Sequence, residues 1–165
     1  MATRSTIAME YADGTVGQVY CHWDGYLEHN GMILYKHYVD PFKTRDLLDQ
    51  GDISSLGVVV GDKHPFSPFG ADDSDKAAHD AAKEAGATTF YGRDRGETGI
   101  EQKMFKDFAD YEKNFQHEEY AYILRKDGNW YVKQYDRPFE LLADALAEQL
   151  RENNEETEKT LVHGG

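Results

Sequence analysis

The stretch EYAYILRKDGNWYVKQYD, residues 119–136, decides much of the fold, because two strand-forming runs lie on either side of an Asp-Gly pair. Aromatic and β-branched residues favour strands, and Asp-Gly between two such runs is the strongest local signal for a β-hairpin. With Asp127 and Gly128 as a two-residue loop, the register follows from the residues that lie opposite each other. The predicted partners are Tyr120 with Tyr135, Leu124 with Tyr131, and Arg125 with Trp130.

A second hairpin is predicted near the start of the chain, from residues 5–11 and 16–24 around Asp13-Gly14. A two-residue loop places one set of side chains on the same face: Ile7, Met9, Tyr11, Val16, Tyr20, His22 and Asp24. The opposite face then carries Ala8, Gly17, Val19, Cys21 and Trp23. Neither face is purely polar, so the pattern leaves open whether one face or both are covered.

Capping residues and apolar spacing predict short helices between and after the hairpins. Their ranges are 30–38, 40–50, 72–86, 104–115 and 138–150, with weaker strand signals in 52–61 and 88–91 and a surface loop over 64–70. The helix over 72–86 has an apolar side of alanine alone, so we expect it to pack lightly. The pattern predicts an α+β fold, with an antiparallel sheet built from two or more hairpins and packed by several short helices. We expect one domain, residues 1–151, and an acidic flexible tail, residues 152–165.

The chain has 165 residues, 31 acidic and 18 basic side chains, and a formal net charge of −13. A field of that sign repels nucleic-acid phosphates and anionic lipid, so we expect no direct nucleic-acid partner and no membrane partner. The charge is typical either of a solubilising surface or of a decoy that imitates DNA on a basic partner. Cys21 is the single cysteine, no apolar run is long enough to span a bilayer, and the start lacks a signal-peptide pattern. These features predict a cytoplasmic protein.

The first candidate site begins on the second strand of this predicted hairpin and comprises His22, Trp23, Asp24, Tyr26 and His29. Two residues apart on a strand, His22 and Asp24 would project side by side, as an imidazole base oriented by a carboxylate requires. If His29 approached the same place, two histidines and one carboxylate would make an open metal site. The alternative is that His22 bonds a backbone carbonyl, Trp23 fills the core and Asp24 makes a turn.

The second candidate site is the glycine-bracketed, charge-dense loop predicted over residues 92–97. Its residues, with the aromatic side chain that precedes them, are Tyr91, Arg93, Asp94, Arg95 and Glu97. The two arginines would clamp an anion while the glycines let backbone N–H groups approach a phosphate. The alternative is that Asp94 and Glu97 pair with the arginines and brace the loop.

Taken together, the two segments offer aromatic rings for stacking a base, arginines for phosphate, and a histidine and carboxylate for chemistry. That inventory suits a nucleotide-type small molecule. No HExxH or other recognised signature is present, so we assign no metal ligands, no cofactor and no catalytic residue.

Several phrases of the sequence, in order, resemble a family of small, mostly uncharacterised proteins of tailed bacteriophages. They are TRSTIA, QVYCHWDGY, HNG with ILYKHY, DISSLG, TTFYGRDRGE and YAYILRKDGNWYV. The resemblance runs from about Ala2 to Tyr135 and implies an accessory protein made in an infected bacterium. It implies no activity for particular residues.

Two functions are therefore expected. The first is an acidic phage protein that binds and inhibits a host or defence protein, with Asp and Glu side chains as the contact set. The second is a nucleotide-ligand protein, either a sponge for a defence signal or a metal-dependent hydrolase, that uses the two candidate sites.

Overall fold

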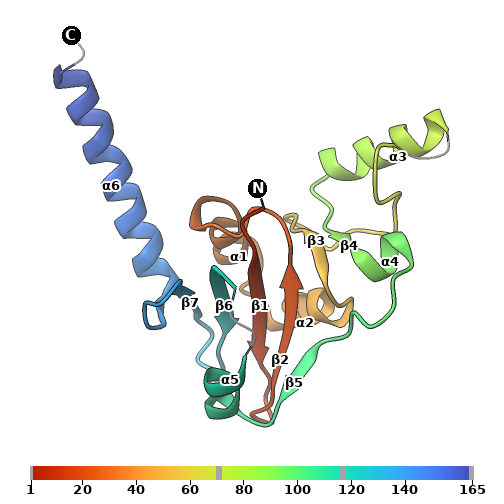
Figure 1. Ribbon diagram of the computed structural model, residues 1–165, viewed down its shortest axis with the longest axis horizontal. Helices are drawn as coiled ribbons and strands as arrows, with labels where there is room; N and C mark the ends of the chain where they lie inside the picture. Colours follow the sequence, from red (N-terminus) through yellow and green to blue (C-terminus); the bar gives the residue numbers. More distant parts are fainter. Residues whose placement is uncertain (1, 70–71, 116–117, 164–165) are drawn as a thin grey trace.

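Within the described residues, one eight-stranded sheet organises the molecule (Figure 1). The computed structural model describes residues 2–69, 72–115 and 118–163, with side chains through residue 156. The strands are β1 (Ser5–Glu10), β2 (Val16–Cys21), β3 (Ile53–Ser55), β4 (Thr89–Phe90), β5 (Lys103–Phe105), β6 (Tyr120–Leu124), β7 (Trp130–Gln134) and β8 (Glu140–Leu141). Their order is β4-β3-β2-β1-β6-β7-β8, and β5 also pairs with β2. The hairpins β1–β2 and β6–β7 join through a parallel β1–β6 pair, so the sheet is mostly antiparallel and the predicted α+β class is confirmed.

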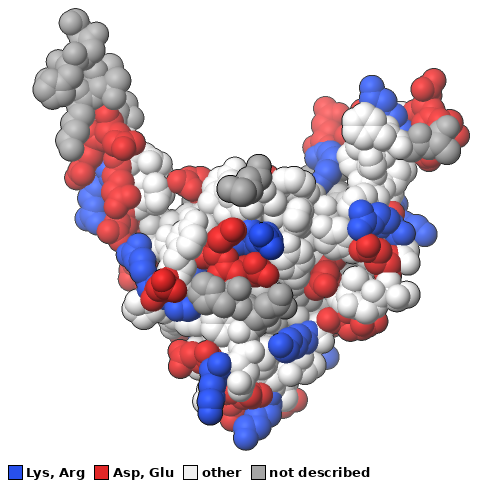
Figure 2. Space-filling view, viewed as in Figure 1, with Lys and Arg blue, Asp and Glu red and all other residues white. Residues whose placement is uncertain are grey.

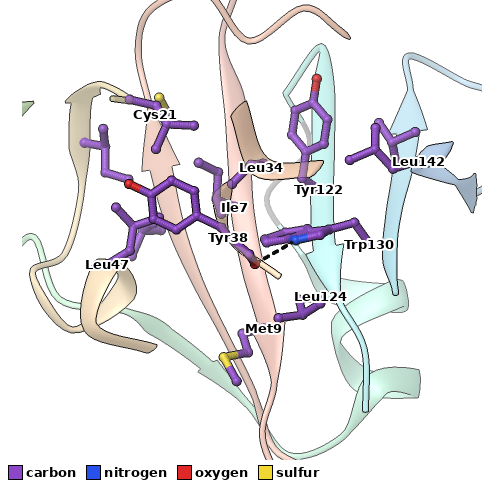
Figure 3. Close-up of a cluster of buried hydrophobic side chains, with 14 of the residues drawn as sticks. Ile7, Met9, Cys21, Leu34, Tyr38, Leu47, Tyr122, Leu124, Trp130 and Leu142 are labelled. Atoms are coloured by element: carbon purple, nitrogen blue, oxygen red, sulfur yellow. Dashed lines mark hydrogen bonds between the residues drawn. The ribbon is translucent and has the colours of Figure 1, made fainter. Parts of the chain in front are cut away.

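Helices cover both faces of this sheet. They are the π-helical turn η1 (Leu27–Gly31) and helices α1 (Met32–His37), α2 (Pro41–Asp49), α3 (Asp73–Glu84), α4 (Tyr91–Arg95), α5 (Phe108–Asn114) and α6 (Leu142–His163). On one face η1, α1, α2 and the first turns of α6 bury the main core. Figure 3 shows Tyr38 and Trp130 in this core, where the indole Nε1 donates to the Tyr38 carbonyl oxygen at 3.0 Å. On the other face α5 buries a smaller aromatic cluster.

Both hairpins exist, but the predicted register is wrong by one residue in each. The observed partners include Ile7 with Val19 and Leu124 with Trp130. Each loop has three residues, 12–14 and 126–128, and its last glycine has a positive φ, +90° in one and +85° in the other. A type I turn followed by a left-handed glycine makes such a loop, and Asp-Gly suits it as well as the two-residue turn. Side chains alternate along a strand, so a shift of one residue puts residues that were predicted to share a face on opposite faces of the sheet.

The register change sorts the side chains of the first hairpin cleanly. Val19 and Cys21 lie in the main core with Ile7, whereas Val16 joins Ala8 in the cluster under α5. Both faces of the hairpin are therefore buried, which decides the question that the sequence pattern left open.

Two predicted helices begin later than expected. The range predicted as a helix from residue 104 instead starts within strand β5, and helix α5 begins only at Phe108. Asp107 caps this helix, since its carboxylate accepts from the backbone N–H of Asp110 at 2.8 Å. The helix predicted from Pro138 likewise follows a short strand and begins at Leu142. In both cases a strand pairs with a neighbour before the helix starts, and pairing of that kind is decided by tertiary contacts.

Two helices leave the sheet as separate arms (Figure 1). Helix α3 buries only His79, whose Nδ1 lies 2.8 Å from the Pro65 carbonyl oxygen, so the light packing predicted from its alanines is confirmed. Helix α6 continues past residue 151 to His163, so residues 152–163 of the predicted tail are helical. Its Glu, Gln and Arg residues have high helix propensity, which explains the difference. No helix in the described ranges carries an apolar run long enough to cross a membrane.

Tyr111 in α5 gives a stability prediction. Its ring stacks on Phe115 at 5.0 Å, and burial raises the pKa of the phenol. Its hydroxyl is buried and has no hydrogen-bond partner within the described ranges. An unpaired buried hydroxyl is destabilising, so Tyr111→Phe is expected to raise the free energy of unfolding by about 1 kcal/mol. Urea denaturation measures the change. As a control, Tyr122 donates to the Gly25 carbonyl oxygen at 2.6 Å, so Tyr122→Phe should lower stability, and equal effects of the two substitutions would contradict the assignment.

Candidate functional site

The first candidate segment lies just beyond β2 and not on it. Strand β2 ends at Cys21, after which the backbone N–H groups of His22 and Trp23 donate to the carbonyl oxygens of Ile53 and Ser54 at 3.0 Å. Asp24 has a φ of +57°, in the left-handed region, so the chain turns sharply there. The prediction that His22 and Asp24 project side by side along a strand is therefore wrong, because the strand ends before both of them.

Each histidine of this segment bonds a near neighbour. His22 Nδ1 lies 2.6 Å from the Tyr20 hydroxyl, and its ring packs edge-on against Trp23. His29 Nδ1 lies 2.8 Å from Asn30 Oδ1. Across residues 2–69, 72–115 and 118–163, no group of three His, Cys, Asp or Glu side chains is placed to hold a metal ion.

Two aromatic side chains of the segment reach the surface. Trp23 is 44% exposed and Tyr26 is 36% exposed, so Trp23 does not fill the core. The backbone N–H of Gly25 donates to the Thr3 carbonyl oxygen at 2.8 Å, which holds this turn against the N-terminal segment. Figure 1 shows this N-terminal segment between the two arms.

The second candidate segment forms helix α4 instead of the predicted loop. Arg93 lies against the body of the protein and uses all of its donor groups there. Its Nε and Nη2 donate to the Asp94 carboxylate at 3.0 and 3.2 Å, and its Nη1 donates to the carbonyl oxygens of Val60 and Gly61 at 3.2 and 2.7 Å. Nη2 also donates to the Thr88 carbonyl oxygen at 2.9 Å. A guanidinium has five N–H donors, so Arg93 has none left for an anion.

Asp94 is the acceptor at the centre of this brace. Its side chain is fully buried, and it accepts from the backbone N–H of His64 at 3.1 Å and of Phe90 at 2.8 Å in addition to Arg93. These bonds join α4, the end of β4 and the loop before α3. The two residues therefore hold separate parts of the chain together, as the bracing alternative predicted.

Arg95 and Glu97 form a second, exposed pair. Arg95 Nη2 donates to Glu97 Oε1 at 2.6 Å, and the guanidinium lies 4.5 Å from the ring centroid of Phe66 and 4.9 Å from that of Tyr91. The Arg95 side chain is 47% exposed. Of the two predicted arginines, Arg95 is the one that faces solvent.

Asp52, a residue that sequence analysis did not single out, joins β2, just before the first candidate segment, to the start of the second segment. Asp52 Oδ1 accepts from the backbone N–H of Tyr20 at 2.9 Å, and its carbonyl oxygen accepts from the backbone N–H of Tyr91 at 3.2 Å. Only a weak strand signal covered this part of the chain. No local pattern could have found Asp52, because its role depends on where β3 lies in the sheet.

A second feature that the sequence did not reveal is an apolar groove of about 460 Å³ beside α2. Phe42 and Val39 line it and are 83% and 53% exposed. Arg45, Arg125 and Lys126 also line it, so it gathers basic side chains in a strongly acidic chain. Arg125 pairs with Glu10 at 3.2 Å.

Acidic side chains gather along the α6 arm (Figure 2). Through residue 156 they are Asp144, Glu148, Glu152, Glu155 and Glu156, and Arg151 is the basic residue among them. Comparisons of the chain with protein-family models, curated proteins and solved structures give no match. The geometry of the arms and of the sites above is therefore what bears on function.

Proposed function

We propose that this protein is a phage-encoded acidic accessory protein that binds and inhibits a host or defence protein in the cytoplasm of the infected bacterium. The observation that carries the binding role is the α6 arm. The resemblance to tailed-phage proteins supports the setting. The net charge of −13 supports a partner with a basic surface, such as a nucleic-acid-binding groove.

Helix α6 is much longer than its contact with the body requires. Through residue 156, its buried residues are Leu142, Ala145 and Leu146, all in the first turns, and Leu150 is already 55% exposed. At about 1.5 Å per residue, the 22 residues of α6 span about 33 Å, most of it away from the sheet. A polar helix of this length that packs on nothing is marginal in water.

Contacts within the arm add little to its stability. Gln149 Nε2 donates to Asn153 Oδ1 at 3.3 Å, and no ion pair joins two α6 side chains in the described part of the arm. The exposed carboxylates therefore remain available to a partner. A helix that presents charged and apolar side chains away from its own domain is a common recognition element.

The test is a pulldown from infected cells with the full chain and with a chain that ends at Arg151. The shortened chain keeps Leu142, Ala145 and Leu146, the α6 residues that are buried in the part of the helix with described side chains, so its melting temperature should stay within about 2 °C of the original. We expect the full chain to recover a host or defence protein that raised salt releases, and the shortened chain to bind it at least about tenfold more weakly.

A matched pair of variants separates the arm from net charge. One variant removes three charges from α6 through Gln replacements at Glu152, Glu155 and Glu156. The other removes three exposed charges from α3 through Asp73→Asn, Asp80→Asn and Glu84→Gln. Only the α6 variant should lose the partner. Equal recovery of the partner by the shortened chain and the full chain would sink the proposal.

A further inference from the structure

The sheet divides at the outer edge of β2. Strand β2 pairs with β5 from Val16 to Gln18 and with β3 at Cys21. Between these two neighbours the backbone N–H of Tyr20 has no strand partner, and the carboxylate of Asp52 accepts it at 2.9 Å. A side chain thus replaces a strand at this fork.

A small polar pocket of about 150 Å³ opens at the fork. Its lining residues are Thr6, Gln18, Val19, Tyr20, Asp52, Glu101 and Lys103. Only one Asp52 oxygen is used by Tyr20, and neither Asp52 nor Glu101 takes part in an ion pair with any described residue. The Lys103 ammonium lies 5.6 Å from the ring centroid of Phe105, which is two residues further along β5. The pocket is therefore lined by two acidic residues that have no ion-pair partner among the described residues.

The pKa of Asp52 reflects its partly buried position near other acidic residues. Burial raises the pKa of its carboxyl above the ordinary value, the N–H of Tyr20 opposes that rise, and the charges of Glu101 and Glu97 add to it. Like charges close together disfavour ionisation, and a cation among them would reverse the effect.

An independent observation is the hydroxyl of Thr6. Thr6 pairs with Tyr20 across β1 and β2, so its side chain shares the face of the sheet on which the pocket lies. It is 2% exposed, and its Oγ1 has no hydrogen-bond partner among the residues that the structure describes. Buried hydroxyls in native proteins are nearly always bonded, so an orphan that lines a polar pocket indicates a missing donor or acceptor.

We infer that the fork pocket binds an organic cation, an alkylammonium or guanidinium group, through the carboxylates of Asp52 and Glu101 and the hydroxyl of Thr6. These groups accept hydrogen bonds, and ammonium and guanidinium groups supply several donors with a positive charge. An anion would be repelled by the negative charges of Asp52 and Glu101. A metal ion would lack ligands, since no three metal-binding side chains come together in the described ranges.

The cation has two sources with the same chemistry. It is either a Lys or Arg side chain of a partner protein, in which case the pocket deepens the proposed function, or a free small cation. The first source suits an acidic protein that binds a basic partner. The pocket itself does not depend on the proposed function being right.

The test is a titration of the full chain with methylguanidinium chloride and with ethylammonium chloride, followed by ¹H–¹⁵N NMR at the Tyr20 amide. We expect a saturable shift of this signal, because its acceptor is Asp52. Sodium chloride at equal ionic strength and tetramethylammonium, which has no N–H donor, should not reproduce it. Asp52→Asn keeps an oxygen for the Tyr20 N–H but removes the charge, and it should weaken binding at least about tenfold.

Further variants and a partner assay complete the design. Glu101→Gln and Thr6→Val should each weaken binding several-fold with little change in melting temperature, which guards against a folding defect in one variant. If Asp52→Asn also weakens a complex recovered from cells, the cation is a partner's side chain; if it leaves the complex unchanged, the cation is free. A shift that does not saturate, or equal saturation in Asp52→Asn, overturns the site even if a partner is found.

Discussion

Asp94→Ala is expected to lower the free energy of unfolding by about 3–5 kcal/mol. The substitution leaves the Arg93 charge in a largely buried position without its counterion, since that side chain is 14% exposed. It also leaves the backbone N–H groups of His64 and Phe90 without their acceptor. Urea denaturation monitored by circular dichroism measures the loss.

The same segment supplies a matched control. Arg95 and Glu97 form an ion pair of the same chemistry, but their side chains are 47% and 42% exposed. Exposed pairs contribute about 0–1 kcal/mol, so Glu97→Ala should cost less than about 1 kcal/mol. If Asp94→Ala were equally mild, Arg93 would not be a structural brace, and an anion-binding role for it would be open again.

Trp130→Ala is expected to lower the free energy of unfolding by about 3–5 kcal/mol, the range for removing a large aromatic side chain from a core. Trp130 is 4% exposed, and it joins β7 to the segment after α1 through its bond to the Tyr38 carbonyl oxygen (Figure 3). The substitution removes both the volume and the bond. Chemical denaturation gives the change in stability.

Two comparisons show whether burial explains the effect. Trp130→Phe keeps most of the apolar volume and loses the hydrogen bond, so it should cost about 1–2 kcal/mol. Trp23→Ala removes the same kind of ring from a site that is 44% exposed and should cost less than about 1 kcal/mol. Similar losses at positions 23 and 130 would argue against the placement of Trp130 in the core.

Residue types alone identified the second candidate site, but its neighbours in the fold decided what its arginines bind. The alternating charges of residues 92–97 predicted either an anion clamp or internal pairs. The structure forms the pairs, because carbonyl oxygens of Val60, Gly61 and Thr88 lie within reach of Arg93. Val60 and Gly61 lie more than 30 residues before Arg93 in the chain, so spacing within the segment could not choose between the alternatives.

Local patterns determined the elements whose signals are local. The Asp-Gly pairs fixed the two hairpins, and the alanine side of α3 fixed its light packing. The register remained undetermined, since Asp-Gly fits loops of two or three residues and the glycine has a positive φ in both. A two-residue type I′ loop also needs a positive φ at the aspartate, which neither Asp13 nor Asp127 has. A one-residue difference exchanges the faces of a strand, so a small local ambiguity had a large effect on the predicted core.

Tertiary structure alone decided the fork in the sheet. Asp52 matters because β3 and β5 both pair with β2 and leave the Tyr20 N–H between them. Each of these strands has only three residues, and such short strands are specified by their neighbours more than by their own sequence. The sequence by itself determined an acidic α+β chain with two hairpins. The meeting of Thr6, Asp52 and Glu101 in one pocket required long-range strand pairing, which no local pattern encodes.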